Sequence, residues 1–255
     1  MSLISVVNKI GGQKLYGIEY SEEPTMQVVA RILNKRGKTV GYLNMDENSK
    51  KYEIEIDRKK YDVEPIIPLN KERPAIIISG ESGLGKSTIG AMYLEQYSEL
   101  LPGRPMYLVS EKDKNIDRNL SQIKGLKQLT SKDIENFYIK NYEDCLFLFD
   151  DSDFGKNSKK VFEMLNLIST VGREYRIGYI FISHYNSRLT ATKAYTEFQI
   201  YVTYLDNLAN NRMLETHMGF PKKQIESFKN IASSYYVFNK IYNILITDQG
   251  VLKYR

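Results

Sequence analysis

One short segment constrains this chain more than any other. It is Gly80-Glu81-Ser82-Gly83-Leu84-Gly85-Lys86-Ser87, which matches the pattern G-x-x-x-x-G-K-[ST] at every fixed position. The β-branched run 75–79 before it is typical of a strand buried on both faces, and apolar residues at helical spacing follow Lys86. Glycines at such a junction let consecutive backbone N–H groups turn toward a phosphate, where the helix dipole also favours an anion. Lys86 can then reach the β- and γ-phosphates, and the Ser87 hydroxyl can ligate Mg²⁺. The segment, continued by Thr88, is therefore predicted to bind ATP and Mg²⁺.

A pair of carboxylates follows the most apolar run of the chain, residues 145–149. A triphosphate-binding loop of this kind needs an acid at the end of a neighbouring buried strand to hold the magnesium shell. Asp150 is predicted to be that acid, and Asp151 is then placed to orient or deprotonate the attacking water. The alternative is a pair of helix-capping aspartates after a core strand.

Another polar side chain, His184, follows the apolar run 178–183. We expect it to contact the γ-phosphate or the water, with an ordinary surface histidine as the alternative. The guanine-reading pattern N-K-x-D is missing, because none of the Asn-Lys pairs is followed two residues later by Asp. ATP rather than GTP is therefore the expected nucleotide.

Apolar strands alternate with helical patterns from residue 75 onward. Strands are expected at 75–79, 105–110, 145–149, 178–183 and 198–204, and helices after Lys86 and at about 157–171. This alternation predicts an α/β fold with a mainly parallel sheet and helices on both faces. The strand at 105–110 is expected between the two motif strands, an arrangement typical of the ASCE division of P-loop ATPases. Residues 234–247 predict a C-terminal β-hairpin.

The first 65 residues have a different pattern of polar and apolar residues from the rest of the chain. Polar and apolar residues alternate at 37–43, 51–56 and 60–63, which predicts half-buried antiparallel strands. A short helix is expected before them, at 24–33, and two prolines mark residues 68–74 as a linker. We therefore expect a small β-rich N-terminal domain, residues 1–67, of open function, and a P-loop ATPase domain, residues 68–255.

Composition excludes several classes of protein. Cys145 is the single cysteine, so neither an intrachain disulfide nor a thiolate zinc cluster can form, and a reducing, cytoplasmic compartment is expected. The chain has no apolar run of about 20 residues and no signal-peptide pattern, so no membrane insertion is expected. The formal charge of +5 is compatible with a nucleic-acid partner.

A larger constellation of motifs resembles a known family. The motifs follow one another in the order Asp150-Asp151, a helix, Thr170-Val171-Gly172-Arg173-Glu174-Tyr175-Arg176 and Ile180-Phe181-Ile182-Ser183-His184. This series resembles poxvirus-type DNA packaging ATPases of the FtsK/HerA-like superfamily. The similarity extends roughly from Pro74 to the C-terminus. It implies an ATP-driven translocase that packages double-stranded DNA into a capsid, with a homo-oligomeric ring and a capsid protein as partners. The expected location is the host cytoplasm or the virion.

The resemblance also implies catalytic roles for individual residues. Lys86, Asp151 and His184 carry over as the catalytic lysine, the second acid and the sensor. Arg173, or failing that Arg176, carries over as the arginine that stabilises transition-state charge. This chain departs from its relatives at three positions. Relatives often have Glu where it has Asp151, and Gln or Asn where it has His184. They commonly have His where it has Glu174.

Two other functions are left open by the sequence. One is a small-molecule kinase, and the other is a nucleotide-binding assembly factor without motor activity. The basic segment 154–160, with Lys156, Lys159 and Lys160, is either a DNA-contacting loop or a solvated charge run at a helix start.

Overall fold

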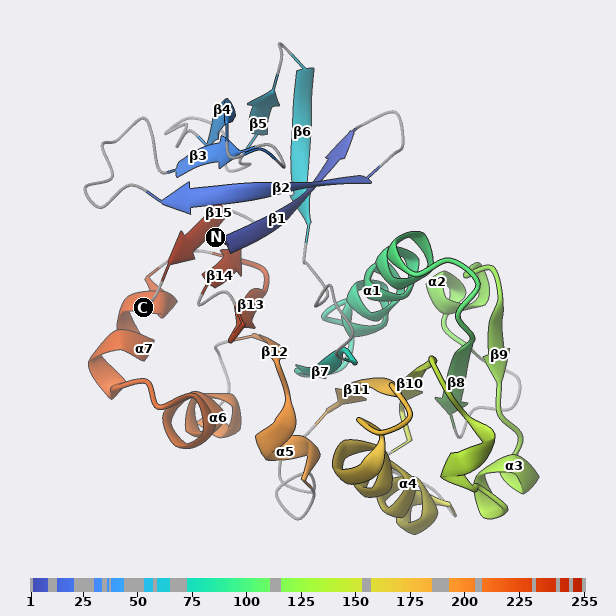
Figure 1. The fold of residues 1–255 in the computed structure, drawn as a ribbon. Helices are drawn as coiled ribbons and strands as arrows, with labels where there is room; N and C mark the ends of the chain where they lie inside the picture. Colours follow the sequence, from blue (N-terminus) through green and yellow to red (C-terminus); the bar gives the residue numbers. More distant parts are fainter. Residues whose placement is uncertain are drawn as a thin grey trace. The chain divides into compact units, whose positions relative to one another are not determined.

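The chain folds into two compact units, one formed by residues 1–66 with 231–255 and the other by residues 67–230 (Figure 1). The computed structural model describes residues 2–8, 13–20, 30–33, 36, 38–43, 53–56, 59–64, 73–110, 116–152, 157–184, 193–204, 208–230, 233–241, 244–247 and 250–253. The predicted ATPase domain, 68–255, thus differs from the second unit in residues 231–255, which group with the N-terminal residues.

The second unit is built on a parallel sheet. Its strands are β7 (Ala75–Ser79), β8 (Met106–Ser110), β9 (Leu126–Gln128), β10 (Leu146–Asp150), β11 (Gly178–Ser183) and β12 (Ile200–Thr203). Within the unit they lie in the order β12-β7-β11-β10-β8-β9, and each neighbouring pair is parallel. Every residue of β7, β10, β11 and β12 is buried, as expected for strands covered on both faces. The predicted α/β fold with a mainly parallel P-loop NTPase sheet is confirmed.

One prediction about the sheet is wrong. The strand between the phosphate-loop strand β7 and the acidic strand β10 is β11, whereas β8, at 106–110, lies on the far side of β10. The reason is the crossover after β7, which passes two strand positions before the chain re-enters the sheet as β8. The ASCE arrangement, with one strand between the two motif strands, is nevertheless present.

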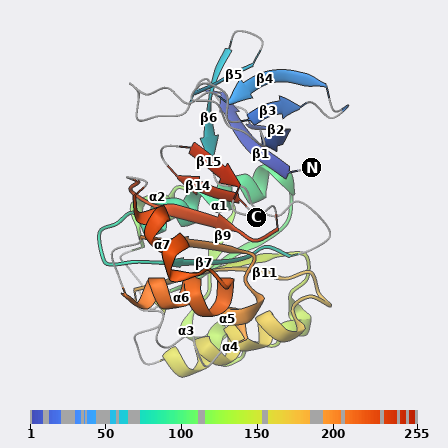
Figure 2. The ribbon, with the colours of Figure 1, turned by 90° about the vertical axis from the view of Figure 1, so that its left-hand side faces the viewer.

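Helices cover both faces of this sheet. The helices α1 (Lys86–Leu100) and α4 (Ser158–Val171) lie on opposite faces in both views (Figure 1; Figure 2). Gly90 lets α1 lie close to the strands, since a Cβ there would come within 2.9 Å of Ile182 and 3.1 Å of Leu148. The helix α4 buries Val161, Met164, Leu165 and Ile168. It begins after Asn157, which forms no side-chain capping hydrogen bond.

Several short elements of this unit were not predicted. They are α2 (Arg118–Ser121), α3 (Ser131–Glu135), a 3₁₀ turn (Ile139–Asn141), α5 (Ala194–Glu197), α6 (Leu208–Met218) and α7 (Lys222–Lys229). Most have one or two turns and too few residues for a periodic pattern. In the described part of the chain, no helix has both the length and the apolar character needed to cross a membrane.

The first unit contains a closed antiparallel barrel. Its strands are β1 (Ser2–Asn8), β2 (Gln13–Tyr20), β3 (Ala30–Leu33), β4 (Thr39–Leu43), β5 (Glu53–Ile56) and β6 (Lys59–Glu64), and β1 pairs with β6 to close it. The strands predicted at 37–43, 51–56 and 60–63 are confirmed at 39–43, 53–56 and 60–63, and residues 37, 51 and 52 lie outside the described part. The predicted helix at 24–33 is wrong at 30–33, where pairing with both β2 and β4 gives a strand; residues 24–29 lie outside the described part.

The C-terminal residues form β13 (Tyr236–Asn239), β14 (Ile244–Thr247) and β15 (Gly250–Lys253). Adjacent strands of this group are antiparallel. The predicted C-terminal hairpin is confirmed, and a third strand, β15, extends it.

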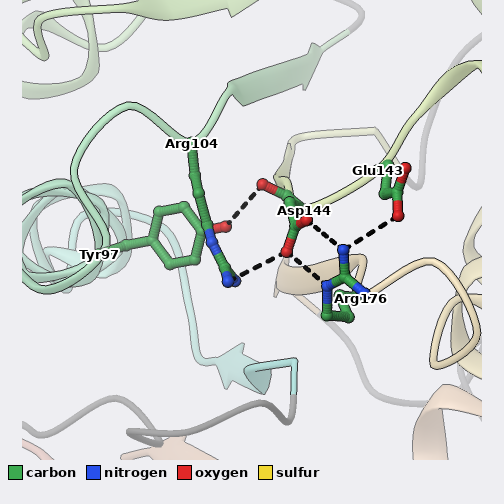
Figure 3. A network of polar contacts seen from close by, with 5 residues as sticks. All are labelled: Tyr97, Arg104, Glu143, Asp144 and Arg176. Atoms are coloured by element: carbon green, nitrogen blue, oxygen red, sulfur yellow. Dashed lines mark hydrogen bonds and ion pairs between the residues drawn. The ribbon is translucent and has the colours of Figure 1, made fainter.

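A polar network ties together the amino-terminal edge of the parallel sheet, where β10 begins (Figure 3). Arg176 donates hydrogen bonds to both carboxylate oxygens of Asp144, one of them at 2.7 Å, and lies 3.0 Å from Glu143. Arg104 lies 3.0 Å from Asp144 on another side, and the Tyr97 hydroxyl donates to the Asp144 carbonyl at 3.4 Å. The network therefore connects the end of α1 with the segments that lead into β8, β10 and β11.

This network predicts a pH-dependent contribution to stability. The hydrogen bonds from Arg176, supported by Arg104, lower the pKa of Asp144 in the folded chain. A carboxyl with a lowered folded pKa stabilises the fold above its unfolded pKa, and this contribution is lost as pH falls through the folded pKa. Asp144→Asn should remove charge-assisted hydrogen bonds of about 1–2 kcal/mol, which lowers the melting temperature at pH 7 by about 2–8 °C.

Thermal unfolding followed from pH 7 to pH 3 checks this expectation. The difference between wild type and Asp144→Asn should shrink once the pH falls below about 4. Glu135→Gln, at an exposed position of α3, is the matched control and should leave the melting temperature unchanged. A difference that stays constant over the whole pH range would contradict the assignment.

Candidate active site

The phosphate loop joins β7 to α1 in the conformation that its glycines require. Gly83 and Gly85 have φ angles of +83° and +81°, in the left-handed region that side chains with a Cβ rarely adopt. Gly85 is the residue directly before α1, so the loop leads into a helix N-terminus with free N–H groups. Residues 81–85 are exposed, which leaves the inner surface of the loop accessible to a phosphate.

Lys86 lies folded over this loop. Its side chain is buried, and its ammonium group donates to the Glu81 carbonyl at 2.6 Å and lies 3.3 Å from Nδ1 of His184. The positive charge is thus held beside the loop and next to the histidine predicted as the sensor. A phosphate in the loop would offer this ammonium group a charged acceptor, which forms a stronger hydrogen bond than a carbonyl does.

The two residues predicted to hold Mg²⁺, Ser87 and Asp150, are in contact. The Ser87 hydroxyl, in the first turn of α1, donates to Oδ1 of Asp150 at 3.3 Å. Asp150 is the last residue of β10 and is buried. The hydroxyl and carboxylate oxygens are the hard ligands that Mg²⁺ prefers. Among the described residues no group of three or more His, Cys, Asp or Glu side chains gathers as a metal site. This donor set fits a Mg²⁺ ion that completes its coordination with phosphate oxygens and water.

The second acid and the sensor form a pair. Oδ1 of Asp151 lies 2.7 Å from Nε2 of His184. A lysine ammonium group can only donate, so Nδ1 of His184 accepts from Lys86, and Nε2 carries the hydrogen that it donates to Asp151. Asp151 has a φ of +49°, which costs a non-glycine residue roughly 1 kcal/mol or more. The chain accepts this strained backbone directly after β10, at the position of the second acid.

These side chains line one pocket of about 300 Å³ at the carboxyl edge of the sheet. Its lining residues are Ser82, Gly83, Gly85, Lys86, Ser87, Thr88, Asp117, Asp150, Asp151 and His184. Most of the residues predicted to bind nucleotide or metal, or to act on water, therefore surround a common space. Gly80, Glu81 and Leu84 belong to the loop but do not line the pocket.

The structure adds residues that the sequence did not single out. Asp117 is a third carboxylate in the pocket lining, and it accepts a hydrogen bond from the Asn119 backbone at 2.9 Å. The Asn119 amide donates to the Thr88 hydroxyl at 3.0 Å, which ties the turn at α2 to the start of α1. Asp117 caps the one-turn helix α2 and Asn119 lies within it; a helix of four residues is too short for a periodic pattern, so no sequence signal pointed to them.

Tyr204, directly after β12, also supports the phosphate loop. Its hydroxyl donates a hydrogen bond to the Leu84 carbonyl, and its buried ring packs against Gly80. A Cβ at position 80 would lie 2.4 Å from that ring, so only glycine fits there. The first glycine of the motif thus makes room for the tyrosine, and the tyrosine holds the middle of the loop.

Tyr204→Phe is expected to raise the KM for ATP about 3–10-fold, because it removes one hydrogen bond of about 1 kcal/mol that orders the loop. The ring is kept, so kcat and the melting temperature should change little. Tyr138→Phe, at a tyrosine that is 53% exposed, is the matched control. Steady-state ATPase kinetics of the two variants provide the measurement, and equal KM values would show that the hydroxyl does not position the loop.

The two predicted arginines lie elsewhere. Arg176 is engaged with Asp144 and Glu143 at the amino edge (Figure 3). Arg173 lies in the turn between α4 and β11 and lines a different pocket, together with Arg73. Both precede β11, whereas the phosphate loop, Asp150 and His184 lie at the carboxyl edge of the sheet. The structure therefore does not bring either arginine to the phosphate loop of its own chain.

In sequence the chain is similar to a protein of Sputnik virophage that is described as uncharacterized protein V3. The identity is 29% over 219 residues, which cover 80% of this chain and 85% of the virophage protein. No protein-family model matches the chain.

Solved structures with partial similarity include the genome packaging NTPase B204 of Sulfolobus turreted icosahedral virus 2 in complex with AMPPCP. It has 11% identity and a TM-score of 0.46, and the match covers 73% of this chain and 98% of B204. The DNA-packaging ATPase B204 of Sulfolobus turreted icosahedral virus has 11% identity and a TM-score of 0.49, with 69% of this chain and 97% of that one covered. The KaiC-like protein PH0186 of Pyrococcus horikoshii has 13% identity and a TM-score of 0.38, with 75% of this chain and all of that one covered.

Proposed function

We propose that this chain is a Mg²⁺-dependent ATPase that translocates double-stranded DNA during the packaging of a viral genome into a capsid. One observation carries the hydrolytic part: the phosphate loop, the Ser87–Asp150 pair and the Asp151–His184 pair surround a single pocket. The sequence resemblance from residue 74 onward supports the packaging part. It implies a homo-oligomeric ring that works with a capsid protein in the host cytoplasm or the virion.

Binding follows from the loop and its lysine. The backbone N–H groups at the start of α1 hold the phosphates, and Lys86 exchanges its Glu81 carbonyl for phosphate oxygens. Ser87 and Asp150 would hold Mg²⁺, and the ion, when bound, neutralises the charge on the β- and γ-phosphate oxygens. Thr88 and Asn119 fix the first turn of α1 behind the loop.

Hydrolysis is assigned to Asp151 and His184. Asp151 accepts a hydrogen bond from Nε2 of His184, which positions the carboxylate that orients the attacking water and takes its proton. His184 also contacts Lys86 through Nδ1. A change at the phosphates that moves Lys86 is therefore transmitted to the acid that acts on the water.

The arginine that stabilises the transition-state charge on the phosphates would come from a neighbouring subunit of the ring. Arg176 is held by two acids of its own chain. Arg173 is the residue to which the sequence resemblance gives this role, and we propose that it acts in trans. DNA contacts are proposed for the start of α4, where Lys159 is exposed and Lys160 pairs with Glu163 at 2.8 Å. The preceding residues of this basic segment, 154–156, lie outside the described part of the chain.

An ATPase assay with and without double-stranded DNA tests the proposal. We expect Mg²⁺-dependent release of phosphate that DNA stimulates, and stimulation that weakens with salt because DNA binding releases counterions. Transfer of phosphate to a metabolite would instead identify a small-molecule kinase. Nucleotide binding without turnover, with or without DNA, would identify an assembly factor.

A further inference from the structure

A second pocket, of about 250 Å³, lies at the amino edge of the parallel sheet, away from the phosphate loop. Its lining residues are Arg73, Ala75, Ser169, Thr170, Arg173, Lys193, Glu197 and Gln199. They come from the start of β7, the end of α4 and the segment around α5. Three cations and one acid give this lining a net charge of +2.

Arg73 is the most buried of the three cations. Its guanidinium group donates to the carbonyls of Ile168 and Ser169 at 2.7 and 2.5 Å and lies 5.7 Å from the centre of the Tyr179 ring. These contacts neutralise the negative end of the α4 dipole, which would otherwise repel an anion. Among the described residues no carboxylate forms an ion pair with Arg73. Burial, followed by smaller effects that include the charge of Arg173, lowers the pKa of its guanidinium group.

Lys193 and Gln199 contribute further hydrogen-bond donors to the pocket. No described side chain pairs with the ammonium group of Lys193, although its backbone N–H donates to Asn166. Gln199 uses its amide oxygen to accept from the Ala75 backbone at 3.2 Å, which leaves its NH₂ group as a donor. Like charges gathered around a partly desolvated space repel one another, and an anion between them would relieve that repulsion.

We propose that this pocket binds a phosphate group as a dianion. The lining charge of +2 matches the charge of inorganic phosphate or a phosphomonoester near neutral pH, and guanidinium, ammonium and amide donors are the groups that recognise phosphate oxygens. The source is either free phosphate or a terminal phosphate of a nucleic acid. The site goes beyond the proposed ATPase function and does not depend on it.

Titration of inorganic phosphate into the full chain carrying Lys86→Ala, followed by calorimetry, tests the pocket, since that substitution weakens the phosphate loop. We expect residual phosphate binding. Lys193→Gln in the same background should weaken it about tenfold, because one charge-assisted contact is lost. Glu197→Gln should strengthen it, because the acid of the lining is removed. Lys124→Gln, at an exposed lysine in a turn remote from the pocket lining, is the matched control for Lys193→Gln.

Competition by duplex DNA with and without 5′-phosphates identifies the source of the ligand. If a DNA end supplies the phosphate, only the phosphorylated duplex should displace inorganic phosphate; if free phosphate is the ligand, neither duplex should. Both outcomes support the site. Absence of phosphate binding to the Lys86→Ala chain, or equal affinities for Lys193→Gln and Lys124→Gln, would overturn it. These titrations are independent of ATP turnover, so failure of the ATPase proposal leaves them interpretable.

Discussion

Lys86→Ala is expected to lower ATP turnover by at least about 10²–10³-fold, the loss typical when one charge-stabilising donor is removed from an active site. ATP affinity should fall as well, because Lys86 is the cation that the structure holds inside the phosphate loop. The loss of the ammonium group also removes the hydrogen bond to His184, so both the binding and the hydrolytic parts of the site are affected.

Fluorescent-nucleotide titration and steady-state kinetics measure the two effects separately. Lys86 is buried, so Lys86→Gln is a second variant that keeps most of the side-chain volume, and thermal unfolding confirms that both variants are folded. Lys124→Ala, at an exposed lysine, controls for the loss of one positive charge. Turnover in Lys86→Gln equal to that of the control would show that the phosphates do not lie in this loop.

Asp151→Asn is expected to reduce kcat by about 10²–10⁴-fold while ATP still binds, because the amide cannot accept the proton of the attacking water. His184→Ala should cost less, about 10–100-fold, since the histidine acts by orienting Asp151 rather than on the water itself. The two residues form one unit, so the double variant should be little worse than Asp151→Asn alone.

Single-turnover kinetics of the two single variants and the double variant test this coupling. The effects of residues that act independently would multiply, and a double variant that loses the full product of both factors would contradict the paired role. Ser82→Ala, which also changes a pocket residue but removes neither the acid nor its partner, serves as the control for general disturbance of the pocket.

The parts of the site that the sequence predicts are those with local physical causes. The left-handed positions of Gly83 and Gly85 require glycine, so the spacing of the motif determines the shape of the loop. Likewise, Asp150 ends the buried strand β10 and His184 follows the buried strand β11, and parallel strands bring their carboxyl ends to one edge. The meeting of Ser87 with Asp150 therefore follows from the order of strands and acids along the chain.

Features that depend on pairing between distant segments were not predictable in the same way. The position of β8 beyond β10 depends on where the chain re-enters the sheet after α1. The sequence of β8 is equally suited to either side of β10. Tyr204 becomes part of the site because β12 lies beside β7, a pairing that no local pattern encodes. Arg176 matches a family element in sequence, but Asp144 and Glu143 compete for it in the folded chain.

A crystal structure of the chain with Mg²⁺ and a non-hydrolysable ATP analogue would show directly whether the phosphate loop, Ser87 and Asp150 bind the nucleotide and its ion. We expect the triphosphate inside the loop of residues 80–87 and Mg²⁺ at about 2.0–2.1 Å from the Ser87 hydroxyl oxygen, with Asp150 bound to the ion directly or through its water. Asp151 should face the γ-phosphate beside His184. A nucleotide bound elsewhere, or an ion that contacts neither Ser87 nor Asp150, would contradict the assignment of this pocket as the ATP site.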